Sequence, residues 1–250
     1  MTRQYPTNKV RDTGILAHID ALILCGGLGM RLRPVVSDRP KVMAEVREKP
    51  FLEIIVRELL RQGSRRIVFC TGYLGDQIEN HFKNSSYPED VILEFSREKK
   101  PLGTGGALKN ALGLVKSENF LVINGDCLSS LNFKGFYLSH LEKKSLLSIA
   151  LVKRNDSDDY GSVVLAKNNE IASFIEKNQK RPIGLVSAGC YLMRKSIKEF
   201  FPAEDVFSLE YDVFPKLAGK SYGFVFDGKF LDIGTPKRYA SAEDFLNKAL

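Results

Sequence analysis

Short apolar runs alternate with helical patterns along the first 152 residues of the chain. The first run, Ala21 to Cys25, is apolar throughout, which is typical of a strand buried on both faces of a sheet. A helical pattern then begins at Pro50 and ends at Gly63. Further strands are predicted at 66–71, 91–95, 120–123 and 146–152, with helices at 74–82, 104–115 and 133–143 between them. This alternation predicts an α/β fold with a doubly wound, parallel sheet.

The second half of the sequence has a different rhythm. Strand patterns at 162–166 and 171–176 flank a Lys167-Asn168-Asn169 turn and predict a hairpin. Other strands are predicted at 186–193, 222–226 and 230–233, the last two around an Asp227-Gly228 turn, with helices at 209–217 and 236–249. We therefore expect a single Rossmann-like domain over residues 21–250, with a mixed, mainly parallel sheet and added antiparallel strands. Residues 1–20 are predicted to be an N-terminal arm.

The charge balance and the apolar runs exclude several classes of protein. The chain has 37 Lys and Arg against 30 Asp and Glu, a net charge of +7, but no run of five basic residues. This balance suits small phosphate-bearing molecules and argues against a nucleic-acid partner, although a merely solvated surface also explains it. No apolar stretch approaches ~20 residues, and the N-terminus lacks the apolar core of a signal peptide. We therefore expect a cytoplasmic protein with no membrane partner.

The cysteines and histidines form no metal-binding pattern. Successive cysteines are 45, 57 and 63 residues apart, so no C-x-x-C pair exists, and the three histidines are scattered. Most of the cysteines lie in or at the end of strand patterns. We expect reduced thiols, mostly in the core, at Cys25, Cys70, Cys127 and Cys190.

A glycine- and arginine-rich loop, residues 26–33, follows the first buried strand. Open α/β sheets bind ligands at the carboxyl ends of their strands, and Gly26, Gly27 and Gly29 would let the backbone approach a phosphate closely. Arg31 adds a planar, permanently charged group. The absence of a G-x-G-x-x-G pattern and of a Walker A sequence excludes the NAD-type oxidoreductase and P-loop classes. On this loop alone, a structural tight turn is an equal alternative.

A second basic motif, Arg39-Pro40-Lys41, follows soon after this loop. Cations on both sides of a glycine-rich loop would suit a polyphosphate leaving group. Taken alone, Lys41 is more simply interpreted as a surface lysine.

Seven motifs, in order, resemble those of the sugar-1-phosphate nucleotidyltransferases, or nucleotide-sugar pyrophosphorylases. They are the Gly-rich loop with Arg39-Pro40-Lys41, Pro50-Phe51-Leu52-Glu53, Pro101 to Leu108, Asn124-Gly125-Asp126, Phe174-Ile175-Glu176-Lys177, Ser187-Ala188-Gly189 and Asp232 to Pro236. Each motif is weak alone, but together they cover about residues 20–248. The resemblance implies a nucleotidyltransferase that transfers a nucleoside monophosphate from an NTP to a sugar 1-phosphate and releases pyrophosphate.

Three further segments, 36–41, 207–210 and 227–230, are most similar to the branch of this family that uses GTP and D-glycero-α-D-manno-heptose 1-phosphate. Mannose-1-phosphate guanylyltransferases and uridylyltransferases for other sugar 1-phosphates are alternatives. A catalytically silent regulatory subunit that binds a nucleotide sugar is a further alternative from a different class. The family often forms oligomers, so a homo-oligomer is compatible with the resemblance.

The resemblance also implies roles for individual residues. Asp126 and Asp232 would hold Mg²⁺ through hard carboxylate oxygens, although alone they are simply a turn residue and a loop cap. The catalytic set would be Arg31, Lys41, Asp126 and Lys177, with Arg31 and Lys41 on the departing phosphates and Lys177 on the sugar phosphate. The nucleotide-binding set would be Gly26, Gly27, Gly29, Met30, Arg31, Lys41, Glu98, Gly103 and Thr104. The sugar-binding set would be Tyr160, Gly161, Glu176, Lys177, Ser187 and Gly189.

Glu98 lies where relatives place a side chain that reads the base. An ionised carboxylate only accepts hydrogen bonds, and guanine offers two adjacent donors, N1–H and N2–H₂. Uracil offers one donor and two acceptors. We therefore predict that Glu98 favours GTP, with a plain charged loop formed by Arg97, Glu98 and Lys99 as the alternative.

Two positions depart from the family pattern. Met30 stands where Thr or Ser is usual, and activity should be weaker if that hydroxyl contacts phosphate. Ser187 stands where Asn is usual, so a contact of the amide with a sugar hydroxyl would be lost or changed. Gly189 would permit close approach of the sugar.

Overall fold

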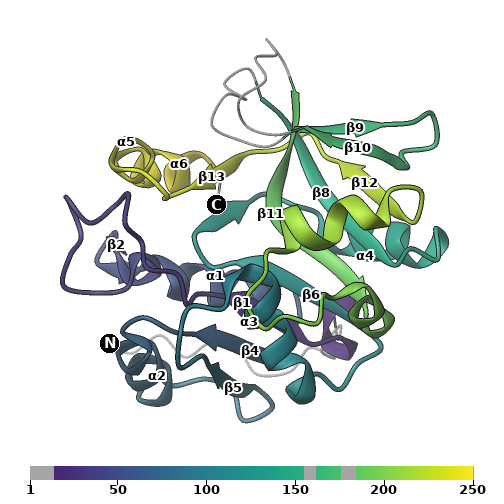
Figure 1. Cartoon of the computed structure of the whole chain (residues 1–250). Coiled ribbons are helices and arrows are strands. Elements are labelled where there is room, and N and C mark those ends of the chain that lie inside the picture. Colours follow the sequence, from purple (N-terminus) through teal and green to yellow (C-terminus); the bar gives the residue numbers. More distant parts are fainter. Residues whose placement is uncertain (1–13, 155–161, 176–183, 250) are drawn as a thin grey trace, which may run out of the picture.

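The computed structural model describes residues 14–154, 162–175 and 184–249 (Figure 1). Four of the predicted site residues, Tyr160, Gly161, Glu176 and Lys177, lie outside these ranges. None of the described helices combines the length and apolar character that a membrane crossing requires.

Within the described ranges, nine strands form one mixed sheet, whose main path is β10-β9-β11-β6-β1-β4-β5. Its parallel part consists of β1 (Ala21–Leu24), β4 (Arg66–Thr71), β5 (Ile92–Arg97) and β6 (Asn119–Asn124). The strand β1 lies between β4 and β6, so that Ala21 stands opposite Ile67 on one side and Leu121 on the other. These four strands follow the predicted ranges to within two residues at each end.

The second half of the chain adds antiparallel strands. The long strand β11 (Gly184–Arg194) pairs antiparallel with β6, β8 (Leu147–Arg154) and β9 (Ser162–Leu165). The strand β9 forms the predicted hairpin with β10 (Ile171–Ile175), and β12 (Ser221–Val225) runs parallel to β8. The expected mixed sheet is therefore confirmed.

Two small ribbons stand beside this sheet in the described chain. In one, β13 (Phe230–Asp232) pairs with β7 (Cys127–Ser129); in the other, β2 (Glu45–Val46) pairs with β3 (Lys49–Pro50). The predicted strands at 222–226 and 230–233 therefore do not pair with each other. The strand β12 belongs to the main sheet, whereas β13 pairs with β7 outside it. Because β7 follows β6 directly in the chain, β13 lies near the end of β6.

Helices cover both faces of the sheet (Figure 1). The α-helices are α1 (Phe51–Arg61), α2 (Gly75–Lys83), α3 (Gly103–Ala111), α4 (Phe133–Glu142), α5 (Pro236–Ala240) and α6 (Ala242–Ala249), and 3₁₀ turns lie at Ile15–His18, Lys41–Met43, Leu112–Leu114, Lys195–Phe200 and Phe214–Leu217. Ile23 of β1 packs in the core cluster that contains α1, and Leu22 in the cluster that contains α3. Because successive strand residues point to opposite faces, α1 and α3 cover opposite sides. The four cysteines are free and buried, as expected.

Two predicted helices are interrupted. The segment 209–217 begins as a π-helical turn, Leu209–Val213, and tightens into a 3₁₀ turn at Pro215, which has no N–H to continue the ladder. The predicted helix 236–249 breaks at Ser241, between α5 and α6. At the other end, Leu16 and Ile19 are buried and pack in the core cluster that contains α1. The boundary of an arm at residue 20 stays a prediction.

Candidate functional site

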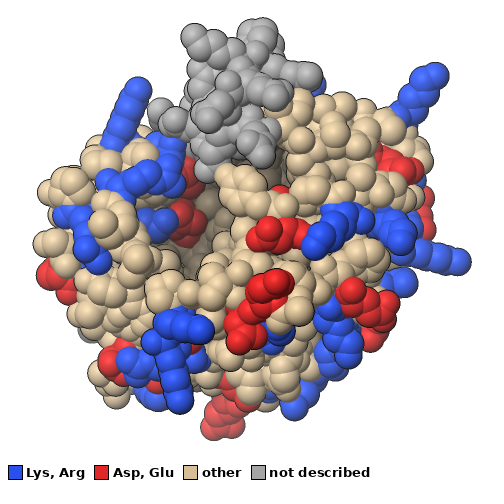
Figure 2. Space-filling model, in the orientation of Figure 1, with Lys and Arg blue, Asp and Glu red and all other residues tan. Residues whose placement is uncertain are grey.

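The parallel strands β5, β4, β1 and β6 all end at one edge of the sheet, and the loops that follow them carry many of the predicted site residues. The strand β1 leads into the glycine-rich loop, β5 into Glu98 and β6 into Asp126. Since β4 and β6 flank β1 on opposite sides, this edge is a topological switch point, where open α/β sheets bind ligands. Figure 2 shows a hollow between the part of the molecule that carries α5, α6 and β2 and the part that carries β11.

The glycines of the loop are present for different reasons. Gly29 has a φ of +63°, and a β-carbon there would lie 2.9 Å from Cβ of Lys41. A β-carbon at Gly26 would lie 2.9 Å from Oε1 of Glu98. Internal packing therefore requires glycine at both positions. At Gly27 a β-carbon would meet no atom within 4 Å, so packing does not explain this glycine, and its exposed backbone is accessible to a ligand.

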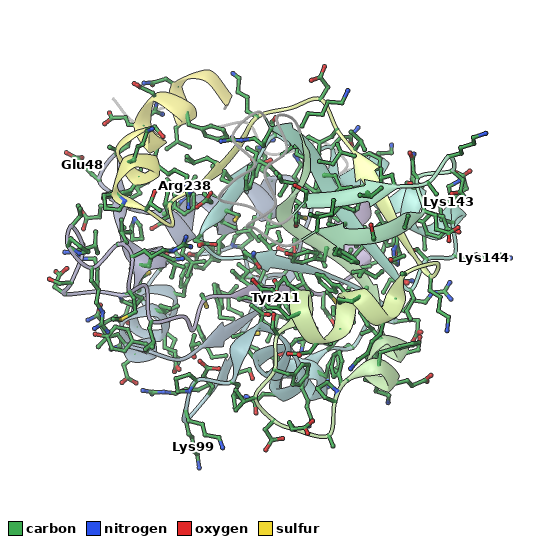
Figure 3. The ribbon with its side chains drawn as sticks, turned by 45° about the horizontal axis from the view of Figure 1, so that its top comes forward. Glu48, Lys99, Lys143, Lys144, Tyr211 and Arg238 are labelled. Carbon is green, nitrogen blue, oxygen red and sulfur yellow. The ribbon has the colours of Figure 1, made fainter. Side chains whose placement is uncertain are left out.

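Glu98 is packed into the base of this loop. Its Oε2 accepts a hydrogen bond of 3.2 Å from the Leu102 N–H, and its Oε1 would lie 2.5 Å from a β-carbon at Gly72. Burial raises the pKa of Glu98, and the hydrogen bond from Leu102 opposes this change in part. The neighbouring Lys99 instead projects from the surface (Figure 3). Glu98 is therefore packed against the loop, unlike exposed Lys99, and its role in reading the base stays a prediction.

Lys41 and Asp126 form an ion pair between residues 85 positions apart. Nζ of Lys41 contacts Oδ2 of Asp126, and the two side chains are 19% and 21% exposed. Burial raises the pKa of Asp126, but the ammonium of Lys41 outweighs burial and holds that pKa below its ordinary value. Asp126 is therefore ionised at neutral pH, which is the form that binds a metal.

The strand β13 places Asp232 next to Asp126. Asp232 stands opposite Cys127 in the β7–β13 ribbon, and the Ile233 N–H donates to the carbonyl of Asp126 at 3.0 Å. Burial raises the pKa of the Cys127 thiol, and the negative charges of both aspartates raise it further. The two aspartates therefore lie in adjoining segments, although they are 106 residues apart in sequence, and their metal role stays a prediction.

Two guanidinium groups converge beside Asp232. Nε of Arg238 lies 2.8 Å from Oδ1 of Asp232, an atom that also accepts the Gly234 N–H at 2.9 Å. A β-carbon at Gly234 would lie 3.2 Å from Nη2 of Arg238 and 3.3 Å from Nη2 of Arg31. Arg31 therefore reaches from the glycine-rich loop to the predicted metal carboxylates. Arg238 lies outside the seven motifs, so no local pattern predicts its place in this site.

The start of α3 is bound to a segment about a hundred residues later. The N–H groups of Gly105 and Gly106 donate to the carbonyl of Phe207 at 3.0 and 3.2 Å. Gly103 has a φ of +75°, and a β-carbon there would lie 2.5 Å from the same carbonyl oxygen. These helix N–H groups are therefore occupied within the protein, and contact of a nucleotide with Gly103 and Thr104 stays a prediction.

Thr104 and Glu210 continue this contact. The Thr104 hydroxyl donates to Oε2 of Glu210 at 2.6 Å and accepts the Leu209 N–H at 2.9 Å. Ser208 caps the π-helical turn and donates its hydroxyl to the same Glu210 oxygen at 2.8 Å. The Thr104 side chain is thus engaged in structure. The sequence alone assigned Glu210 no role.

Ser187 and Gly189 lie in a bulge of β11, where the register with β8 shifts. The Ser187 hydroxyl accepts the Gly189 N–H at 3.1 Å and so stabilises the bulge. Gly189 has a φ of +65°, and a β-carbon there would lie 2.8 Å from Sγ of Cys127. Packing alone therefore requires this glycine, and approach of a sugar to it stays a prediction.

The side chain of Met30, in the glycine-rich loop, is exposed.

A pocket of about 280 Å³ adjoins Asp232. Arg154, Lys229 and Arg238 line it together with Asp232 and Asp244, so cations outnumber carboxylates on its wall. A larger pocket of about 480 Å³, between the β2–β3 ribbon and α1, contains no predicted site residue. Of these two pockets, only the smaller one is lined by a predicted site residue, Asp232.

The side chains at this edge suit a Mg²⁺ ion that is shared with substrate phosphates better than a metal ion held entirely by protein ligands. The described part of the chain contains no group of three His, Cys, Asp or Glu side chains arranged to hold a metal. Asp126 and Asp232 supply two carboxylates. Mg²⁺ is typically bound by one or two carboxylates together with substrate phosphates and water, so the residues present fit this ion.

The chain is similar to several known proteins. Residues 20–249 match the nucleotidyl transferase family. A D-glycero-α-D-manno-heptose 1-phosphate guanylyltransferase of Aneurinibacillus thermoaerophilus is 37% identical over 90% of this chain and 97% of its own length. A mannose-1-phosphate guanylyltransferase of Mycobacterium tuberculosis is 30% identical over 88% of this chain and 62% of its own length. The crystal structure of HddC from Yersinia pseudotuberculosis in complex with GMP-PN has 37% identity and a TM-score of 0.80, and the match covers 91% of this chain and 99% of HddC.

Proposed function

Because the chain belongs to the nucleotidyl transferase family, we propose that it transfers GMP from GTP to D-glycero-α-D-manno-heptose 1-phosphate. A phosphate oxygen of the sugar 1-phosphate attacks the α-phosphorus of GTP, and the bond from that phosphorus to the bridging oxygen of the β-phosphate breaks. The products are a GDP-sugar and pyrophosphate. The similarity to a heptose guanylyltransferase over 90% of the chain supports this choice of substrates.

The observation that carries the proposal is the convergence of Arg31, Lys41, Asp126 and Asp232 at one edge of the sheet. Phosphoryl transfer of this kind depends on alignment and charge neutralisation more than on acid–base chemistry. Arg31 and Lys41 would bind the β- and γ-phosphates and stabilise pyrophosphate as it leaves. Asp126 and Asp232 would hold Mg²⁺, which when bound neutralises phosphate charge.

Other residues would position the two substrates. The backbone of Gly26, Gly27, Gly29 and Met30 would approach the phosphates, and that of Gly103 and Thr104 the nucleoside. An exposed Met30 is compatible with a contact made through the backbone N–H alone. The sugar phosphate would bind Lys177, and the sugar would contact Tyr160, Gly161, Glu176, Ser187 and Gly189.

Glu98 would select guanine. Its Oε2 is already fixed by the Leu102 N–H, so the carboxylate has one orientation at the base of the loop. The remaining acceptor positions match the N1–H and N2–H₂ donors of guanine. Uracil would set an acceptor against a carboxylate oxygen, which costs free energy because neither group can donate a hydrogen bond.

The test is a pyrophosphate-release assay with four NTPs against heptose 1-phosphate and mannose 1-phosphate. We expect the highest kcat/KM for GTP with the heptose substrate. Glu98→Gln should lower kcat/KM for GTP by roughly 10- to 100-fold, because it replaces an acceptor with a donor, and should change UTP turnover little. The exposed Glu89→Gln serves as the matched control. Equal use of GTP and UTP by the unaltered chain would contradict the role of Glu98.

Mannose 1-phosphate is the second candidate sugar, because a mannose-1-phosphate guanylyltransferase shares 30% identity over 88% of the chain. The same assay decides between the two sugars by comparing their kcat/KM values with GTP. Absence of pyrophosphate release with every pair, from folded protein and with Mg²⁺ present, would contradict the proposed activity.

A further inference from the structure

Arg238 supplies a positive charge to a carboxylate that is almost entirely removed from water. The side chain of Asp232 is 7% exposed and that of Arg238 is 15% exposed, with Nε of the arginine 2.8 Å from Oδ1 of the aspartate. An isolated carboxylate this deeply buried would be strongly unfavourable, and the guanidinium of Arg238 places an opposite charge directly beside it. Figure 3 places Arg238 at the base of the α5–α6 segment, whereas Lys143 and Lys144 extend outward.

Local structure holds Arg238 in this position. Thr235 caps α5 and accepts the Arg238 N–H through its hydroxyl at 3.4 Å, which fixes the backbone of the arginine. The Oδ1 atom that contacts Arg238 also accepts the Gly234 N–H. The Gly234 and Thr235 contacts both lie in the short connection between β13 and α5. This connection therefore holds Asp232, at the end of β13, and Arg238, in α5, in a fixed relative position.

We propose that Arg238 is a built-in counter-ion of Asp232 that competes with a divalent metal ion for this carboxylate. The inference rests on the proposed metal role of Asp232, and not on the identity of the nucleotide or the sugar. A guanidinium beside the carboxylate already satisfies part of its charge and repels a second cation. The free protein therefore binds the divalent ion weakly, and the phosphates of an incoming nucleotide offset the repulsion.

The experiment measures Mn²⁺ binding to the full chain at pH 8 without nucleotide, by the electron paramagnetic resonance signal of free Mn²⁺. Arg238→Gln keeps a hydrogen-bond donor and removes the charge, and it should tighten Mn²⁺ binding by about tenfold. Arg238→Lys keeps the charge and should bind Mn²⁺ as the unaltered chain does. Lys237→Gln removes an equal charge from the neighbouring, exposed position of α5 and is the matched control, with no change expected.

Thermal unfolding provides a second readout. Without metal, Arg238→Gln should melt at a lower temperature, because buried Asp232 loses the adjacent positive charge of Arg238. Saturating Mn²⁺ should raise its Tm by more than it raises that of the unaltered chain, since tighter binding to the native state stabilises it more. Unchanged or weaker Mn²⁺ binding by Arg238→Gln would overturn the inference. Asp232→Asn tests the underlying assumption separately: unchanged Mn²⁺ binding in that variant would contradict the metal role of Asp232 itself.

Discussion

At the scale of single residues, Gly27 differs from the other glycines of its loop. Its neighbours Gly26 and Gly29 are explained by close contacts with Glu98 and Lys41, and the φ of Gly29 is positive. Gly27 has neither a close contact nor a positive φ, so a methyl group there would fit the free protein. A methyl group at Gly27 would therefore interfere only with a ligand that approaches this backbone.

We expect Gly27→Ala to leave the free energy of unfolding within about 0.5 kcal/mol of the original value, as for a surface change that disturbs no contact. It should raise the KM for GTP several-fold, because the β-carbon occupies the space that a phosphate would enter. Urea unfolding and initial-rate kinetics measure the two effects. Gly29→Ala is the contrasting variant, which we expect to lose about 1–3 kcal/mol of stability from its left-handed backbone. A Gly27→Ala variant with unchanged KM would remove this position from nucleotide binding.

Some residues of the site can be predicted from the sequence, and others cannot. Asp126 and Asp232 stand out in the sequence because each belongs to an ordered set of motifs; Asp126 follows β6, and Asp232 is the last residue of β13. Arg238 does not stand out, because it lies outside these motifs. Only the folded structure shows that its guanidinium turns back to Asp232, which precedes it by six residues.

At the scale of elements, the start of α3 depends on the π-helical turn at Leu209–Val213. The carbonyl of Phe207 accepts the first helix N–H groups, and Thr104 and Ser208 both donate to Glu210. Helix–strand alternation predicts α3 itself, but not this docking, because the partner segment lies about a hundred residues away. π-helical turns are rare in proteins, and those that occur are often found at functional sites. Here the turn joins the predicted nucleotide loop to the segment that precedes β12.

We expect Thr104→Val to destabilise the protein by about 1–3 kcal/mol, because it leaves the Leu209 N–H without its acceptor and Glu210 without one donor. The loop before α3 should then be less ordered, so KM for GTP should rise more than kcat falls. Chemical denaturation and steady-state kinetics provide both values. Thr104→Ser keeps the hydroxyl and should behave as the unaltered chain. If Thr104→Val were equally stable, the contact with Glu210 would carry no stabilising role.

At the scale of the whole molecule, the sheet explains why scattered charges become a site. The parallel strands β1 and β6 end at one edge, and the β7–β13 ribbon adds Asp232 there, so Arg31, Lys41 and Asp126 meet residues from the far end of the chain. The net charge of +7 does not predict which charged residues meet at this edge. The alternation of elements was sufficient to predict the sheet, whereas the pairing of β12 and β13 with different partners depended on tertiary packing that alternation does not encode.

The stability of the whole chain should depend on pH through His140, which joins α4 to the sheet. The imidazole is buried and lies 2.9 Å from the hydroxyl of Ser148 and 3.2 Å from Oδ1 of Asn119. Burial, followed by the charge of Arg194, lowers the pKa of His140 from 6.5 to about 4. The folded chain therefore keeps this histidine neutral, while the unfolded chain takes up a proton below pH 6.5.

Stability from His140 is thus fully present above pH 6.5 and is lost as the pH falls toward 4, to a maximum of about 3 kcal/mol. Urea unfolding at pH 7.5, 6, 5 and 4.5 measures this loss. Carboxylates titrate over part of the same range, so the decisive quantity is the difference between variants. His140→Asn is expected to be less stable at pH 7.5 but to have a shallower pH dependence than the unaltered chain. The exposed His18→Gln should keep the original dependence. Parallel pH profiles for His140→Asn and the unaltered chain would show that the buried imidazole does not control acid stability.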